Sequence, residues 1–378
     1  MSKRAYRLAS CAAIILLAML FLFVGNRIAM RDMPDLNNKY GSYQTVEAKV
    51  TEIHDTINSN VLFEAVVIRG ANHSSIMAIQ NTNQNYLSGA KRVEVGDKVV
   101  ISRYWDSAWE FVEYVRIDKI ALLAAAFVAL LLIFGRVKGL NAVLALGLTC
   151  AAIFAVFLPS LLSGKNIYVS SVVTCVFSVV VTLLIVNGAD RKSFSAIMGC
   201  LGGVVAIGVL TFVMNKALGI TGVLNKDSML FLYLFKTNPI DLKAVIFAGV
   251  MIGAVGAVMD VAMSISSALW ELKSKAAHLN FGGLVGSGIN ISRDIMGTMA
   301  NTLVLAYVGN SLSVIVLLSV YVKSLAELVN REMVIVELLQ AVIGSFGILL
   351  TMPLTTLICA ALYSKPPLAK QDDAENVS

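Results

Sequence analysis

The feature that most limits the fold of this chain is a series of long apolar runs. The runs lie near residues 8–24, 120–134, 140–158, 167–186, 194–214, 242–265, 296–322 and 334–362. A helix needs about 20 such residues to cross a hydrocarbon layer of roughly 30 Å. Because 57% of the residues are apolar and only 14% are charged, a water-soluble fold could not bury them all. We predict an all-α polytopic membrane bundle with about eight transmembrane helices.

The first run follows a basic N-terminus, and we interpret residues 1–25 as an uncleaved anchor helix. Leu8-Ala-Ser-Cys11 is similar to a lipoprotein cleavage box, but a signal peptide has its apolar stretch before the cleavage site. A cleaved leader is the alternative. The basic N-terminus and the short basic loops 136–138 and 191–192 predict that both termini are cytoplasmic, because such loops stay inside.

Between the first two runs lies a hydrophilic region, residues 26–118, which this orientation places outside the membrane. Runs of β-branched and aromatic residues, separated by turn residues, occur at 45–53, 61–68, 75–79, 98–103 and 109–117. Five short strands predict a small all-β, OB-like barrel. Such barrels can bind nucleic acid or sugars, but basic residues here are balanced by acidic ones, so we favour an assembly or lid role.

Three other segments complete the organisation. The apolar stretch 229–235 is too short to span and is interpreted as interfacial or re-entrant. The glycine-rich stretch 282–288 lacks the Lys-Ser/Thr of a phosphate-binding loop, so we expect a flexible cytoplasmic hinge. The helix bundle is predicted over 119–363, and the polar tail 364–378 is predicted to be disordered and cytoplasmic.

The sequence indicates neither a metal nor a cofactor site. All five cysteines lie within apolar runs and lack metal-ligand spacing. His54, His73 and His278 are isolated, without a helical partner at ligand spacing. No Ser, His and acid grouping suggests hydrolysis, so we expect no enzyme. Basic residues are scattered, so we expect no nucleic-acid partner.

Polar residues inside apolar runs are costly and therefore mark candidate functional positions. In the sixth run, a stripe at spacings of three and four shares one helix face: Gly249, Gly253, Gly256, Asp260 and Ser264. The glycines and Ser264 predict a helix-packing seam. Asp260 is expected within that seam, away from lipid.

Similar stripes occur in the last two runs, with Asp294 and Asn301 in one and Glu337 and Gln340 in the other. If the three stripes face one another, Asp260 and these four residues line a shared interior that binds a proton, a cation or a substrate. Arg293 could form an ion pair there. Helix packing explains the small residues equally well, and headgroup or loop contacts explain Asp294 and Glu337.

Residues 253–272, beginning Gly-Ala-Val-Gly-Ala-Val-Met-Asp, and residues 293–307, beginning Arg-Asp-Ile-Met-Gly-Thr, closely resemble the YibE/F-like family. The resemblance implies a multi-pass plasma-membrane protein of a bacterium. It supplies neither a substrate nor catalytic residues.

Our leading hypothesis is a proton- or cation-coupled secondary transporter or permease, in which Asp260 binds the ion with help from neighbouring polar residues. The alternative is a non-transporting scaffold whose outer domain recruits an envelope or secretion partner. An intramembrane enzyme acting on lipid-linked substrates has less support. The expected partners are the lipid bilayer and either a second copy of the chain or another membrane or envelope protein.

Overall fold

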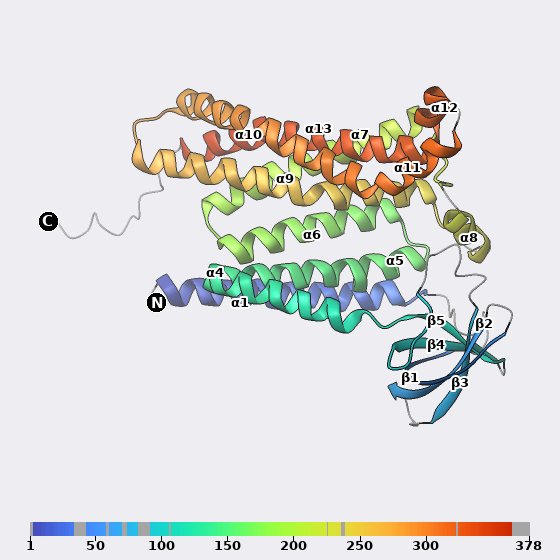
Figure 1. The fold of residues 1–378 in the computed structure, drawn as a ribbon. Coiled ribbons are helices and arrows are strands. Elements are labelled where there is room, and N and C mark those ends of the chain that lie inside the picture. The colour runs from blue at the N-terminus through green and yellow to red at the C-terminus, as the bar shows by residue number, and fades with distance from the viewer. Residues whose placement is uncertain are drawn as a thin grey trace. The chain divides into compact units, whose positions relative to one another are not determined.

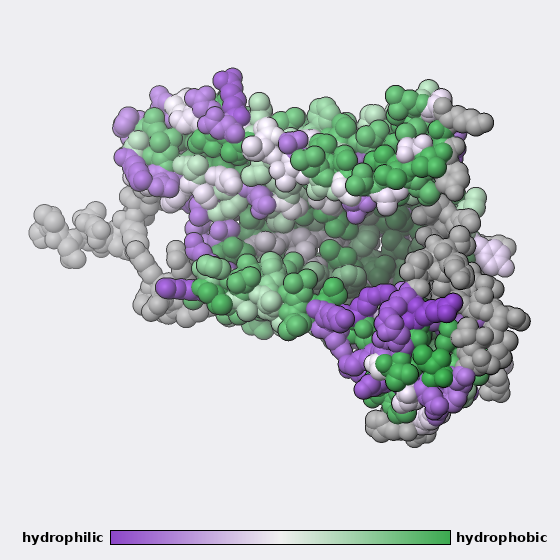
Figure 2. Space-filling model, viewed as in Figure 1, coloured by the Kyte–Doolittle hydropathy of each residue, from purple (hydrophilic) through white to green (hydrophobic). Residues whose placement is uncertain are grey.

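In the computed structural model, the described residues are 3–33, 43–57, 60–69, 74–81, 91–105, 107–224, 226–235, 239–322 and 324–364. The chain divides into two compact units. Residues 34–133 form one unit, which contains the strands, and residues 1–33 with 134–378 form the other, which is helical. Figure 2 shows hydrophobic residues over much of the helices, while hydrophilic residues gather on the barrel and near some helix ends.

The smaller unit contains a five-stranded barrel, which confirms the sequence prediction (Figure 1). Its strands are β1 (Tyr43–Ile57), β2 (Asn60–Arg69), β3 (Ser75–Asn81), β4 (Lys98–Tyr104) and β5 (Trp109–Tyr114). They close in the order β1-β2-β3-β5-β4, with only β3 and β5 parallel among the pairs. Alternate residues of β2, such as Phe63 and Ala65, fill the interior, as expected when side chains alternate between faces.

The larger unit consists of long apolar helices, which confirms the predicted helical class. The helices are α1 (Lys3–Met30), α4 (Ile117–Ala152), α5 (Leu158–Leu162), α6 (Ile167–Asn187), α7 (Arg191–Ala217), α8 (Lys226–Leu234), α9 (Leu242–Lys275), α10 (Phe281–Asn310), α11 (Leu312–Tyr321), α12 (Leu325–Asn330) and α13 (Glu332–Tyr363), the start of α4 belonging to the barrel unit. Within the described residues, six helical stretches are long and apolar enough to cross a membrane. A seventh is added if the bent pair α10 and α11 counts as one span.

One of these stretches is too long for a single crossing. Ile117–Leu162 contains 46 residues, which at 1.5 Å per residue measure about 70 Å, more than twice the hydrocarbon thickness. Arg136, with φ 48° and ψ −123°, interrupts it. The two halves coincide with the predicted runs 120–134 and 140–158.

The glycine-rich segment 282–288 is helical, so the predicted flexible hinge is wrong. α10 already begins at Phe281, and the side chain of Asn280 caps it by accepting a hydrogen bond from the Gly283 N–H at 2.9 Å. Gly288 lies so close to α13 that a Cβ there would be 2.5 Å from Thr356 Cγ2. Gly288 therefore permits close packing of α10 against α13.

The short apolar stretch 229–235 overlaps α8, a helix of nine residues. Such a helix is only about 13 Å long, so it cannot cross the hydrocarbon layer. The predicted disordered tail lies almost wholly outside the described residues, which end at Ser364.

The closest helix packing involves α7 and α13. Gly199 and Gly203 of α7 lie directly against Thr355 and Thr351 of α13, and a Cβ at Gly199 would be 2.9 Å from the Thr355 Cα. These glycines form a G-x-x-x-G pattern, which permits close approach of helices in membranes. This seam holds together the helices around the candidate site, because α13 also packs against α9 and α10.

Substituting Gly199 by alanine is expected to destabilise the bundle by about 1–3 kcal/mol, because backbone atoms must move to accommodate the methyl group. Thermal unfolding of the detergent-solubilised protein measures this effect. Gly208→Ala, on the same helix, is the control: its nearest neighbouring atoms would be at ordinary contact distances of 3.5 Å or more. Equal melting temperatures for the two variants would contradict the assigned seam.

Candidate ion-binding site at a broken helix

The predicted stripe on α9 lies on the surface of the single chain. Gly249, Gly253, Gly256, Asp260 and Ser264 are all exposed. A Cβ at Gly256 would meet no atom within 4 Å. The predicted burial of Asp260 in a packed seam is therefore wrong for the single chain, in which the closest glycine packing occurs between α7 and α13.

The predicted polar residues of α10 also lie on the surface. Asp294, Asn301 and Arg293 are exposed. In the part of the chain that the structure describes, Arg293 forms no ion pair with Asp260, Asp294 or Glu337. The structure therefore does not bring all the predicted residues into one interior.

A different set of residues gathers where the seventh predicted span breaks. α10 ends at Asn310 and α11 begins at Leu312, with a bend of 55° between them. Ser311, between the two helices, is buried, and its hydroxyl donates to the Tyr307 carbonyl at 3.0 Å. At membrane depth, an interrupted helix is tolerated where it is buried in protein or lines a cavity.

A small cavity lies beside this break, between α10, α11 and α13. Its volume is about 40 Å³, and a single water needs at least roughly 10–15 Å³, so one water or a small cation fits. Most of the lining is aliphatic, and the polar members include Tyr307, Ser311 and Glu337. Three helices thus enclose a few polar groups within an apolar site.

Two polar atoms at this cavity are buried without a partner. Across the described chain, neither Oε2 of Glu337 nor the hydroxyl of Tyr307 has a hydrogen-bonding partner. Glu337 as a whole is half-buried, and a buried polar atom without a partner costs about 1–3 kcal/mol. A cation in the cavity would give the Oε2 atom such a partner.

The α9 stripe contacts this site at one end. Gly253 lies against the Tyr307 hydroxyl, which a Cβ at that position would displace. A Cβ at Gly249 would be 3.9 Å from Gln340 Nε2, and Gln340 lies one helical turn beyond Glu337. The structure thus brings Gln340 of α13 near Gly249 and Tyr307 of α10 near Gly253.

Tyr307 is the residue that the sequence analysis missed. Its hydroxyl is polar, but its ring suits an apolar run, so it did not stand out as an intramembrane polar group. A signal was available, because a buried tyrosine hydroxyl usually finds a partner. Tyr307 is also the last residue of the segment 293–307, one of the two segments that carry the family resemblance.

Comparison with known proteins gives one match. No curated protein and no solved structure is significantly similar to this chain. The sequence model of the YibE/F-like protein family matches residues 123–365, which is well over half of the chain and includes the whole candidate site. The chain therefore belongs to the YibE/F-like family.

Proposed function

We propose that this protein is a proton- or cation-coupled secondary transporter or permease in which Glu337 binds the coupling ion. The observation that carries the proposal is the unpartnered Glu337 carboxylate in a cavity at a broken helix. Secondary transporters commonly form their ion and substrate sites from discontinuous helices. Tyr307 and Ser311 line the same cavity, and hydroxyl oxygens are suitable ligands for a hard cation.

In this proposal Asp260 does not bind the coupling ion, in contrast to the hypothesis drawn from the sequence. With Asp294 and Asn301 it belongs to an exposed polar surface on α9 and α10. Charged groups within membrane spans face protein or water, so we propose that a second copy or another membrane protein covers this surface. We further propose a bacterial plasma membrane, cytoplasmic termini and a barrel on the outer side.

The proposal is tested with protein reconstituted into vesicles on a solid-supported electrode. Rapid jumps in proton or Na⁺ concentration should evoke a current in the wild type, and Glu337→Gln should reduce it at least tenfold, because the neutral amide cannot exchange a proton or hold a cation.

Glu327→Gln is the matched control, since Glu327 pairs with Arg331 at 2.7 Å in an exposed position. It should keep a wild-type current. Asp260→Asn tests which of the two carboxylates binds the ion. Loss of current in this variant alone would assign ion binding to Asp260 instead of Glu337. A wild-type current in Glu337→Gln would overturn the proposal.

A further inference from the structure

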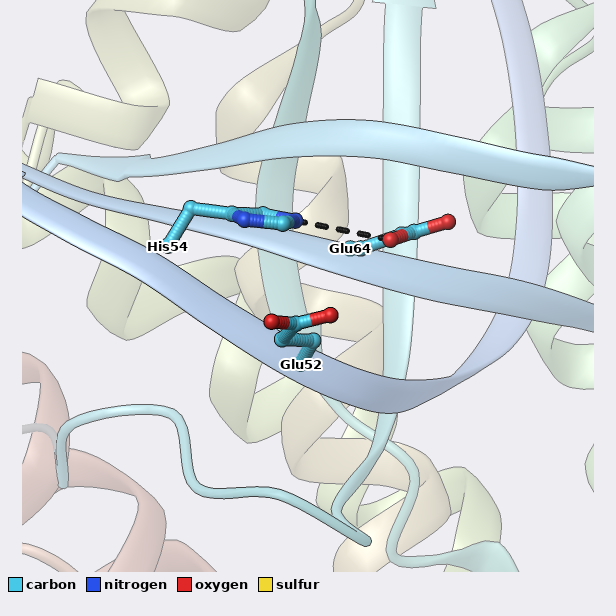
Figure 3. Close-up of side chains that lie close together, drawn as sticks. All are labelled: Glu52, His54 and Glu64. Atoms are coloured by element: carbon cyan, nitrogen blue, oxygen red, sulfur yellow. Dashed lines mark hydrogen bonds and ion pairs between the residues drawn. The ribbon is translucent and has the colours of Figure 1, made fainter.

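Three potential metal ligands lie close together on the barrel. Glu52 and His54 of β1 lie beside Glu64 of β2 (Figure 3). One ligand atom from each side chain can be chosen so that all three atoms lie within 4.8 Å of one another. The expectation that His54 is isolated is therefore wrong, because its neighbour belongs to the adjacent strand.

The strand register explains this meeting. Glu52 and Glu64 are direct cross-strand partners, and the register shifts between Val50 and Glu52 and again between Ile53 and Asp55. Such irregularities redirect side chains. They accompany the approach of His54 to the carboxylate of Glu64.

The two glutamates of the cluster lie opposite each other, and a bound cation would offset their mutual repulsion. Like charges directly opposite one another destabilise a sheet, and Glu52 faces Glu64. Among the residues that the structure describes, no lysine or arginine forms an ion pair with either glutamate.

The distance between His54 and Glu64 also suits a metal better than a hydrogen bond. Their Nε2 and Oε2 atoms are 3.4 Å apart, whereas a hydrogen bond between charged groups is about 2.7–2.9 Å long. Two ligands bound at about 2.1 Å to a tetrahedral ion lie about 3.4 Å from each other. The pair is therefore already spaced as two ligands of one ion.

We propose that Glu52, His54 and Glu64 bind a divalent transition-metal ion, with Zn²⁺ as the ion that the donors favour. One imidazole nitrogen and two carboxylate oxygens are ligands of the kind found in three-ligand zinc sites, which leave a fourth position open. Because Glu52 and His54 are exposed and Glu64 is half-buried, the ion exchanges with solvent. The Ser75 hydroxyl, which donates to Glu64, positions that ligand.

The test uses the full chain in detergent, without a histidine tag. Calorimetric titration with Zn²⁺ and visible absorption with Co²⁺ should show one site in the wild type. His54→Ala and Glu64→Gln should each weaken Zn²⁺ binding at least tenfold and remove the tetrahedral Co²⁺ bands. Ser75→Ala should weaken it by about tenfold, as loss of an outer-shell partner does.

Glu47→Gln is the control, because Glu47 lies on the same strand and approaches Arg69 rather than the cluster. Fluorescence of Trp109, recorded in a background where Trp105 and Trp270 are replaced by phenylalanine, checks that the barrel remains folded in each variant. Glu52→Gln replaces any variant that unfolds. Wild-type affinity in the ligand variants, or the same loss in Glu47→Gln as in Glu64→Gln, would overturn the site. Neither outcome bears on the current assigned to Glu337.

Discussion

Replacing Glu332 by alanine is expected to destabilise the protein by about 2–4 kcal/mol, because hydrogen bonds to a charged group contribute roughly 1.5–3 kcal/mol each. The Glu332 carboxylate accepts from the backbone N–H of Thr221 at 2.7 Å, from that of Gly222 at 2.6 Å and from the Thr221 hydroxyl at 2.8 Å. These hydrogen bonds connect the loop after α7 to the first turn of α13. A negative charge is also favourable at that helix end.

Thermal unfolding in detergent measures this effect, with an expected fall in melting temperature of about 4–8 °C at roughly 2 °C per kcal/mol. Glu332→Gln keeps the shape and loses the charge, so it should fall between wild type and alanine. Glu327→Gln removes only an exposed ion pair and should change stability by less than about 1 kcal/mol. A Glu332→Ala protein as stable as Glu327→Gln would show that the loop contact contributes little.

The architecture was largely predictable because it depends on local patterns. Alternating β-branched residues located all five strands, and the lengths of the apolar runs located the helices. The break at Arg136 coincides with the basic loop predicted between two runs. The bend at Ser311 was not predicted, because residues 296–322 form a continuous apolar run in which the bent helix and a straight one have the same composition.

The candidate sites were harder to predict because they depend on contacts between elements. The small residues of α7 and α9 have the same spacing, yet only those of α7 pack tightly against α13. Periodicity identifies a helix face but not what covers it. His54 and Glu64 meet only through the register of β1 and β2, which a search for ligands spaced along one helix cannot find.

Replacing Glu337 by methionine is expected to stabilise the protein while abolishing its ion-evoked current. Glu337 lies only five residues after Glu332, yet its Oε2 atom is buried without a partner among the described residues. An apolar side chain of similar volume removes that cost, and we expect a gain of about 1–3 kcal/mol. Stability gained at the expense of activity is the usual outcome when a strained functional group is replaced.

Two further variants separate the ion site from general packing. Tyr307→Phe removes the second unpartnered hydroxyl and should also raise the melting temperature, while weakening the current. The methyl group added by Gly253→Ala would displace the Tyr307 hydroxyl, so this variant should reduce the current. The methyl group added by Gly256→Ala would have no neighbouring atom within 4 Å, so that variant should keep the current. If Glu337→Met melts well below the wild type, its carboxylate has a stabilising partner in the folded protein. The unpaired charge on which the proposed ion site depends would then be absent.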